Sequence, residues 1–168
     1  MRAVPIRLPQ QLDACVGLII PGGESTTISK LMDSYGFYEP IAARHAEGMA
    51  VWGTCAGAIL IAKRIVDGVE GQRGLDLMDV EVRRNAYGRQ TESFEADLDF
   101  AHIGEAYRGV FIRAPWIESV GDGVEVLARH EGHIVAARQG TLLATTFHPE
   151  LTGDPRIHRY FVDKVVRS

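Results

Sequence analysis

Residues 50–62 have the sequence AVWGTCAGAILIA, and this stretch decides the fold of the chain. An apolar run leads into Gly-Thr-Cys-Ala-Gly, and an apolar helical pattern follows immediately. That order predicts a strand, a tight turn with Cys55 at its tip, and a helix, which together form a nucleophile elbow. Gly53 and Gly57 allow the backbone to adopt strained dihedral angles and allow a substrate to approach closely.

An elbow at Cys55 has two chemical consequences. The thiol would face the N-terminus of the helix, where the positive end of the helix dipole favours the thiolate. The N–H of Ala56, directly after the nucleophile, would be free to bind a developing oxyanion. The alternative is an inert cysteine in a strand–helix corner, because free cysteine is among the most buried residue types. The GTCAG motif by itself leaves both interpretations open.

The size and composition of the chain predict one soluble globular domain over residues 1–168. Apolar residues make up 46% and charged residues 24%, as is usual for such a domain. A net charge of −4 gives no electrostatic argument for binding to nucleic acid or to an anionic membrane. Two cysteines are too few for a disulfide framework and indicate a reducing compartment. With neither a signal peptide nor a membrane-spanning run in the sequence, we expect a cytoplasmic protein.

Around the elbow, strand-like and helical patterns alternate. Ser25 is a suitable N-cap for a helix that ends near Tyr35, where Gly36 follows. This alternation predicts an α/β fold with a parallel sheet and helices on its faces. The expected elements of this half are a strand over 15–20, a helix over 26–35, a helix over 38–46, a strand over 49–53 and a helix over 56–66.

The second half of the chain is richer in strand patterns. Residues 77–83 alternate apolar and charged side chains, as a half-exposed strand does. Residues 133–147 have the pattern of a hairpin that turns at Gln139 and Gly140. Further strands are expected over 109–113 and 124–129, and a final amphipathic helix over 155–166.

A second candidate group, His148-Pro149-Glu150, directly follows a predicted strand. In extended backbone, side chains at positions i and i+2 point to the same side. The Glu150 carboxylate could therefore bind one ring nitrogen of His148 and leave the other to face a nucleophile. By itself His148 is better interpreted as an inert histidine. A thiol at a second strand end favours catalysis, because active sites of open α/β sheets lie beyond the strand C-termini.

A third strand end carries PGGES, residues 21–25. Its consecutive glycines could turn a backbone N–H toward the thiol and supply an oxyanion donor beside Ala56. The alternative is a phosphate-binding loop or a simple turn, because two adjacent glycines are a weak signal. No metal-ligand spacing occurs in the sequence, so we expect no metal and no cofactor.

Together, three motifs resemble the class I (triad) glutamine amidotransferases: PGGESTT (21–27), GTCAG (53–57) and FHPEL (147–151). This family has a three-layer, flavodoxin-like α/β fold with a mostly parallel central sheet. Within it, RRNAYGRQ (83–90), ESFEAD (92–97) and VFIRAP (110–115) resemble the glutaminase subunits of pyridoxal 5′-phosphate synthase. The resemblance extends from about Arg7 to Val162, which is nearly the whole chain.

The resemblance implies a glutamine amidohydrolase that supplies ammonia to a synthase subunit, its expected partner in a hetero-oligomer. Cys55 would attack the side-chain amide of L-glutamine, His148 would shuttle the proton, and Glu150 would hold the imidazole. The N–H groups of Gly23 and Ala56 would bind the oxyanion. The family analogy places the glutamine pocket at Gly23, Glu24, Ser25, Arg84, Ile112 and Arg113. A surface charge remains the better interpretation for Arg83 and Arg89.

The chain departs from this family at its N-terminus. The family normally opens with a β-α unit whose strand is expected near the centre of the sheet, so we expect an N-terminally truncated fold with two neighbouring strands left unpaired. Two other function classes therefore stay open. One is a truncated, non-catalytic paralogue that only binds the synthase subunit. The other is a different cysteine hydrolase on a similar scaffold, against which the RRNAYGRQ block argues.

Overall fold

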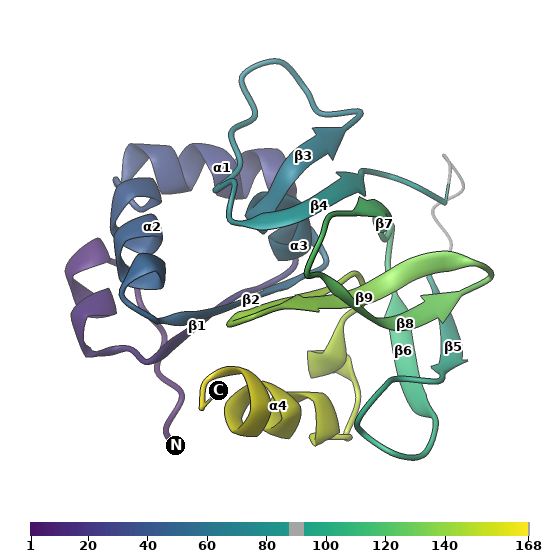
Figure 1. The fold of residues 1–168 in the computed structure, drawn as a ribbon. Coiled ribbons are helices and arrows are strands. Elements are labelled where there is room, and N and C mark those ends of the chain that lie inside the picture. The colour runs from purple at the N-terminus through teal and green to yellow at the C-terminus, as the bar shows by residue number, and fades with distance from the viewer. Residues whose placement is uncertain (88–92, 168) are drawn as a thin grey trace.

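A twisted sheet runs through the centre of the protein in the order β1-β2-β10-β9-β7-β4-β3, with β8 paired to β9 (Figure 1). The computed structural model describes residues 1–87 and 93–167. The strands are β1 Gly17–Ile20, β2 Ala50–Thr54, β3 Ala62–Val66, β4 Met78–Arg83, β7 Trp116–Val120, β8 Glu125–His130, β9 His133–Gln139 and β10 Leu142–Thr145. Strands β5 (Phe94–Leu98) and β6 (Tyr107–Phe111) form a separate two-stranded sheet.

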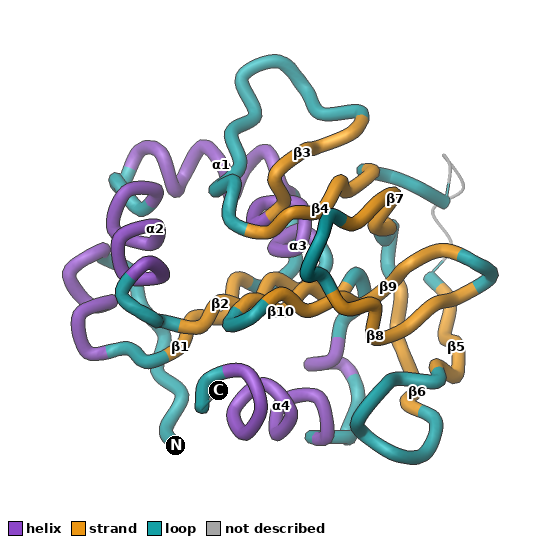
Figure 2. Tube along the Cα trace, in the orientation of Figure 1, coloured by secondary structure: helices purple, strands orange, loops and turns teal. Residues whose placement is uncertain are grey.

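Helices cover both faces of the central sheet (Figures 1 and 2). The α-helices are α1 Ser25–Ser34, α2 Tyr38–Ala46, α3 Ala56–Ile61 and α4 Arg156–Tyr160, and α4 continues into a π-helical turn, η3 Phe161–Val165. Helices α1, α2 and α3 lie on one face and α4 on the other, each over its own apolar cluster. This arrangement confirms the predicted α/β class. The 3₁₀-helices are η1 Pro9–Ala14 and η2 Pro149–Leu151.

The directions of the strands divide the sheet into two parts. Strands β1 and β10 both pair with β2 in parallel, as expected. Strand β3 pairs in parallel with β4, but β9 pairs antiparallel with β10, β7 and β8, and β7 with β4. The sheet is therefore mixed rather than mostly parallel. The reason is the short turn after Gln139, because a tight hairpin can join only antiparallel strands.

Strand β2 separates the two cores. All five of its residues are buried, as its continuous apolar sequence predicted. Trp52 packs in the α4 cluster and Val51 in the α1–α3 cluster, so alternate side chains serve opposite faces. The Nε1–H of Trp52 donates to Thr145 Oγ1 of β10 at 3.0 Å. This strand therefore ties both cores to the residue that follows it, Cys55.

The helix after the elbow is shorter than the pattern predicted. Helix α3 ends at Ile61, and residues 62–66 form strand β3 instead of the expected last turns. The returning chain supplies the reason, because the N–H groups of Leu75 and Leu77 donate to the carbonyls of Leu60 and Ile61. These contacts satisfy the carbonyl groups that a helix end leaves open. Tertiary hydrogen bonds therefore override the local helical pattern.

Most other expected elements are present with shifted ends. Helix α2 has the predicted bounds, and the predicted strands over 15–20, 77–83, 109–113 and 124–129 appear as β1, β4, β6 and β8. The hairpin over 133–147 appears as β9 and β10. The sequence analysis did not predict β5 or β7. Both are five residues long and only partly buried, so their apolar pattern is weak.

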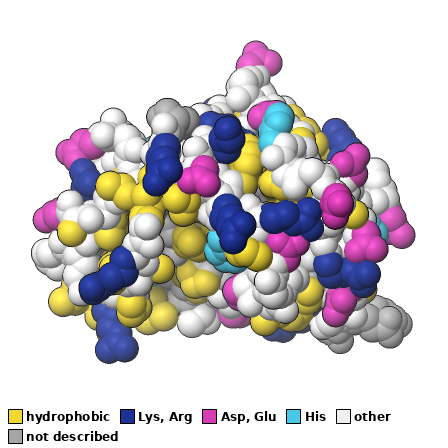
Figure 3. Space-filling view, turned by 90° about the horizontal axis from the view of Figure 1, so that it is seen from below, with side chains coloured by type: hydrophobic (Ala, Val, Ile, Leu, Met, Phe, Trp, Pro, Cys, Tyr) yellow, Lys and Arg dark blue, Asp and Glu magenta, His cyan; other side chains and the backbone are white. Residues whose placement is uncertain are grey.

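Strand β1 lies at one edge of the described sheet. The expected pair of unpaired strands is not found, because β1 and β2 pair with each other over four residues. Among the described residues, β1 and β3 are the two end strands of this order, and the outer edge of β1 has no neighbouring strand. Viewed from below, hydrophobic side chains gather on the left half of the protein (Figure 3). Exposed apolar residues of the first nineteen positions are Met1, Val4, Leu8, Val16 and Ile19.

The helices of the described part of the chain are all too short or too polar to cross a membrane.

The close contact between α3 and β1 gives a testable prediction. A Cβ atom on Gly57 would collide with the carbonyl oxygen of Ile20, which is backbone and cannot turn away. We expect Gly57→Ala to lower the free energy of unfolding by about 1–3 kcal/mol, as overpacking does. Urea denaturation followed by Trp fluorescence measures the change. Gly153→Ala is the matched control, because a Cβ there meets nothing within 4 Å; equal stability of the two variants would contradict the packing argument.

Candidate active site

The elbow has the predicted geometry. Cys55 ends β2 and precedes α3 with φ 48° and ψ −106°, a left-handed conformation that is unusual for a residue with a side chain. Its N–H donates to the carbonyl of Thr145 at 2.8 Å, so the β2–β10 ladder holds the strained residue in place. A Cβ on Gly53 would run into the backbone of Gly57. The turn therefore needs a small residue at this position, as its sequence indicated.

His148 and Glu150 form the expected pair, although through a different backbone. His148 Nδ1 lies 2.8 Å from Glu150 Oε1. Residues 148–150 do not form an extended segment, because His148 is the N-cap of the 3₁₀-helix η2 and Glu150 lies inside that helix. Pro149 at the first position of that helix has the φ that the turn needs. The bond leaves Nε2 as the ring nitrogen available for proton transfer.

The sheet brings Cys55 and His148 to the same edge. Both follow neighbouring parallel strands, and both line one cavity of ≈ 300 Å³. Gly22, which follows β1, lies against both residues. A Cβ on Gly22 would lie 2.5 Å from His148 Cε1 and 3.3 Å from Cys55 Cβ. The backbone of His148 is also fixed, because its main-chain N–H donates to the carbonyl of Val110 at 2.8 Å. Three strand ends therefore meet at one point.

Burial sets the resting state of the thiol. Cys55 is 6% exposed, and this burial raises the pKa of its thiol to about 11. The N–H of Ala56 hydrogen-bonds to the thiol and lowers that pKa, while the charge of Glu150 raises it. The carbonyl oxygen of Ile112 lies 4.0 Å from Sγ and can accept the thiol proton. Desolvation thus outweighs the hydrogen bond from the Ala56 N–H and favours the thiol over the thiolate that the helix N-terminus was expected to favour.

The same cavity collects nearly all the predicted site residues. Glu150 alone stands outside it, behind His148. The lining also includes three residues that the sequence analysis did not single out: Ile59, Asn85 and Pro115. Asn85 follows Arg84 directly, and its φ of 46° marks a tight turn, which the sequence did not reveal. The predicted residues in the lining are Gly23, Glu24, Ser25, Cys55, Ala56, Arg84, Ile112, Arg113 and His148.

Charges of both signs face this cavity. Arg84 Nη2 lies 3.5 Å from Glu24 Oε1, and the Arg84 side chain is only 12% exposed. Arg113, with φ 45°, is a second cation in the lining. A space with a carboxylate and two guanidinium groups suits a small zwitterion with a free carboxylate and a free ammonium group.

Glu24, rather than Ser25, is the N-cap of α1. Its carboxylate accepts hydrogen bonds from the N–H groups of Thr26 (3.2 Å) and Thr27 (2.7 Å) and from both threonine hydroxyls. The bond from the Thr26 hydroxyl is the main cause that lowers the Glu24 pKa to about 2. Glu24 therefore stays ionised at any working pH, and Ser25 is left free to face the cavity.

The two proposed oxyanion donors lie on the cavity wall. Gly23 has φ 146°, a conformation open only to glycine. The N–H of Ala56 already points at the thiol sulfur. The Ala56 N–H is thus already in place to bind a carbonyl oxygen that becomes negative beside Sγ.

Some predicted features lie elsewhere. Arg83 is a surface charge that pairs with Glu118 (2.8 Å) and Asp67 (2.7 Å), as expected. Arg89, and with it residues 88–92 of the two narrower motifs, lies outside the described residues. Within the described ranges 1–87 and 93–167, no three His, Cys, Asp or Glu side chains are grouped to hold a metal ion.

Known proteins resemble this chain over nearly its whole length. The model of the SNO glutamine amidotransferase family matches residues 1–167. A protein of Nocardioides sp., named pyridoxal 5′-phosphate synthase subunit PdxT, is 55% identical over 100% of this chain and 86% of its own length. A protein of the same name from Roseiflexus castenholzii is 60% identical, over 94% of this chain and 85% of its own length.

A solved structure described as a glutamine amidotransferase also resembles this protein. It superposes with a TM-score of 0.92 at 48% identity and covers 100% of this chain and 88% of its own. This similarity confirms the flavodoxin-like, three-layer fold expected from the sequence.

The contact at Gly22 gives a prediction for activity. Alanine at this position would push the imidazole of His148 away from Cys55, because its Cβ would occupy the place of the ring. We expect Gly22→Ala to reduce turnover by about 10²-fold, the usual cost of displacing a reacting group by about 1 Å. Steady-state kinetics of amide hydrolysis would measure it, with Gly153→Ala as the control. If Gly22→Ala retained turnover within twofold of the wild type, the position of the His148 imidazole beside Gly22 would not be required for activity.

The raised thiol pKa gives a second prediction. A native pKa of about 11 keeps Cys55 protonated at pH 7 and ionises it only in strong base. In a Cys15→Ser background, alkylation by iodoacetamide should stay slow at neutral pH and keep rising beyond about pH 9, whereas an unperturbed thiol levels off above its pKa of about 8.5. Mass spectrometry of the labelled protein gives the rate at each pH. A plateau already reached by pH 8 would contradict the burial argument.

Proposed function

Because the chain belongs to the SNO glutamine amidotransferase family, we propose that it hydrolyses the side-chain amide of L-glutamine to L-glutamate and ammonia. The observation that carries this proposal is the meeting of a strained cysteine elbow and a carboxylate-held histidine in one cavity. This arrangement supplies a nucleophile, a base and an orienting group for acyl transfer.

The reaction begins with proton transfer from the Cys55 thiol to His148 Nε2. Because burial keeps the thiol protonated, this transfer accompanies the attack of sulfur on the amide carbon. The new S–C bond leaves a tetrahedral oxyanion, which the N–H groups of Gly23 and Ala56 bind. The C–N bond then breaks, His148 returns the proton to the leaving nitrogen, and ammonia departs. Water, deprotonated by His148, hydrolyses the γ-glutamyl thioester and restores the thiol.

The charges of the cavity would select the free amino acid. Arg84 and Arg113 would bind the α-carboxylate of glutamine, and the charge of Glu24 would attract its α-ammonium group. Ser25 and Ile112 complete this end of the pocket. A peptide-bound glutamine has neither terminal charge, so the same contacts would exclude it.

The ammonia is proposed to pass to a synthase subunit that builds pyridoxal 5′-phosphate. Support comes from the curated relatives, whose name makes them subunits of that synthase. We also propose that the chain binds this synthase subunit in a hetero-oligomer and that it is located in the cytoplasm. Both cysteines are free, which fits a reducing compartment. A non-catalytic paralogue would have no use for the strained elbow at Cys55, and no observation favours that alternative.

Glutamate release tests the proposal. The chain should release glutamate from L-glutamine, alone or with a pyridoxal 5′-phosphate synthase subunit, and Cys55→Ala should abolish the release. Glu150→Gln should reduce kcat by about 10- to 10²-fold, which is less than for a buried orienting carboxylate, because the Glu150 side chain is 47% exposed and partly screened. An enzyme-coupled glutamate assay measures both effects.

Circular dichroism of each variant controls for folding. Absence of Cys55-dependent release, both with and without the synthase subunit, would overturn the proposed activity and leave a binding role.

A further inference from the structure

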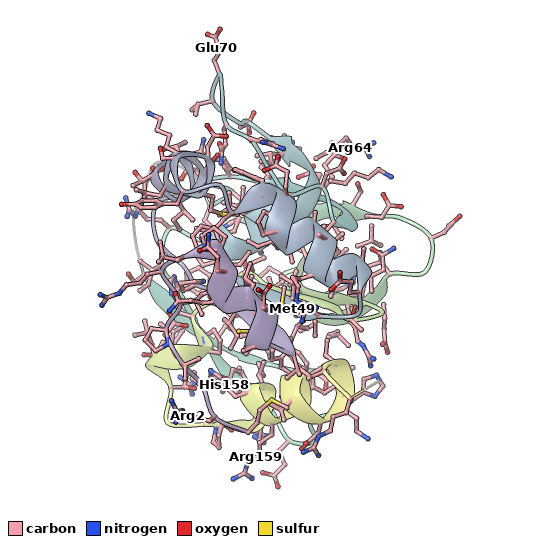
Figure 4. All side chains as sticks on the ribbon, turned by 90° about the vertical axis from the view of Figure 1, so that its left-hand side faces the viewer. Arg2, Met49, Arg64, Glu70, His158 and Arg159 are labelled. Atoms are coloured by element: carbon pink, nitrogen blue, oxygen red, sulfur yellow. The ribbon has the colours of Figure 1, made fainter. Side chains whose placement is uncertain are left out.

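The loop that joins β3 to β4, residues 67–77, projects from the sheet and then turns back to α1 (Figure 1). Glu70 lies at its outer end and points away from the protein (Figure 4). The N–H of Gln72 donates to the carbonyl of Val69 at 3.0 Å, and Gly71 between them has φ 78°. This is a tight turn with glycine where a positive φ is needed. It reverses the chain and directs Gln72 inward.

The next residue, Arg73, fixes the loop to two helices. Ser29 Oγ accepts from the Arg73 N–H at 3.2 Å and donates to the Arg73 carbonyl at 2.9 Å. The buried hydroxyl of Tyr38 donates to the same carbonyl at 2.8 Å. The Arg73 guanidinium lies 4.3 Å from the centre of the Tyr38 ring and bonds to Glu39 at 3.0 Å. Gln72 is therefore held by rigid neighbours on the side away from the loop tip.

Gln72 reaches the wall of the active-site cavity. Its Nε2–H donates to Ser25 Oγ at 3.0 Å. Ser25 and Ser29 lie one turn apart on α1 and are 4% and 3% exposed, so both hydroxyls face the returning loop. Ser25 also lines the cavity that holds Cys55. One hydrogen bond thus links a loop outside the site to a residue of the proposed glutamine pocket.

The direction of this bond determines what Ser25 can do. A serine hydroxyl has one proton to donate and two lone pairs that accept. Gln72 occupies a lone pair, so the proton of Ser25 stays available for another acceptor. No acceptor for it is recorded among residues 1–87 and 93–167. The hydroxyl is therefore set as a donor at the cavity wall, where oxygen atoms of a bound amino acid can accept.

We propose that Gln72 is a positioning residue that holds the Ser25 hydroxyl as a hydrogen-bond donor to the bound glutamine. This inference rests on the proposed function. A role in packing alone does not explain the amide, because Gln72 Oε1 is buried without a partner. Methionine would fill similar space without an unpaired oxygen, whose burial is unfavourable. The NH₂ group of the Gln72 side chain, which donates to Ser25, therefore explains why position 72 carries glutamine rather than methionine.

Reversing the hydrogen bond gives a sharp test. A carboxylate at position 72 can only accept, so Gln72→Glu would draw the proton of Ser25 away from the cavity. We expect its KM for L-glutamine to rise about five- to tenfold, as in Ser25→Ala, with kcat within about twofold, because one neutral hydrogen bond to substrate is lost. The double variant Gln72→Glu with Ser25→Ala should show no further rise. Gln72→Met should raise KM less, because it leaves the Ser25 proton free.

Glu70→Gln is the matched control, because it changes one charge in the same loop at an exposed tip, and its KM should equal that of the wild type. An unchanged KM for Gln72→Glu would overturn the inference, as would a fall in kcat with unchanged KM. A KM for the double variant far above that of Ser25→Ala would overturn it too, because the two residues would then act separately.

A second measurement needs no activity. The carboxyl group introduced by Gln72→Glu should titrate at lower pH in carbon NMR than the same group in the Ser25→Ala background, because the hydroxyl stabilises the carboxylate. Equal values would show that the two residues do not interact, and the inference falls. If the wild type releases no glutamate while this difference is found, the contact stands but the proposed function fails, and with it the role toward substrate.

Discussion

The parallel pairing of β1 and β10 on the two sides of β2 is the constraint on which the site depends. Ile20 pairs with Gly53, and Thr145 with Thr54, so the three strands end almost level. The chain then leaves each strand at the same edge and carries Gly22, Cys55 and His148 to one place. Residues far apart in the sequence therefore meet without any direct bond between their side chains, because the backbone ladder sets the distance.

Close packing at this edge determines the chemistry as well as the geometry. Gly57 lies against the carbonyl of Ile20 and Gly22 against the ring of His148, and no larger residue fits at either position. The same packing excludes water from Cys55 and raises the pKa of its thiol. Close packing thus has two opposite effects. It orders the residues of the site, but it also keeps Cys55 as the less reactive thiol. In the proposed mechanism, His148 therefore removes the thiol proton during attack, and no preformed thiolate is needed.

The sequence was sufficient wherever a motif is local. The elbow, α2 and the hairpin over 133–147 follow from apolar patterns and turn residues close in the chain. It failed where distant groups decide, since α3 ends early because Leu75 and Leu77 return to its carbonyls. It also placed the N-cap of α1 one residue too late, because the Glu24 side chain binds the N–H groups of Thr26 and Thr27. The sequence also did not predict the contact of Gln72 with Ser25, because 47 residues separate the two and no sequence pattern connects them.

The proposed catalytic residues and the proposed substrate-binding cations follow different strands. Cys55 and His148 follow β2 and β10, whereas Arg84 follows β4 of the same sheet, and Arg113 follows β6 of the separate small sheet. The segments that bear these two cations are joined by the backbone pairing of Arg83 with Trp116 and by aromatic packing. The Tyr87 ring centroid lies 5.4 Å from that of Trp116 and 6.3 Å from that of Phe111, and the Tyr87 hydroxyl is buried without a partner. Tyr87 therefore contributes its ring and not its hydroxyl. The β4–β7 ladder and the packing of the Tyr87 ring therefore act together to place Arg84 and Arg113 in the lining of the cavity that holds Cys55.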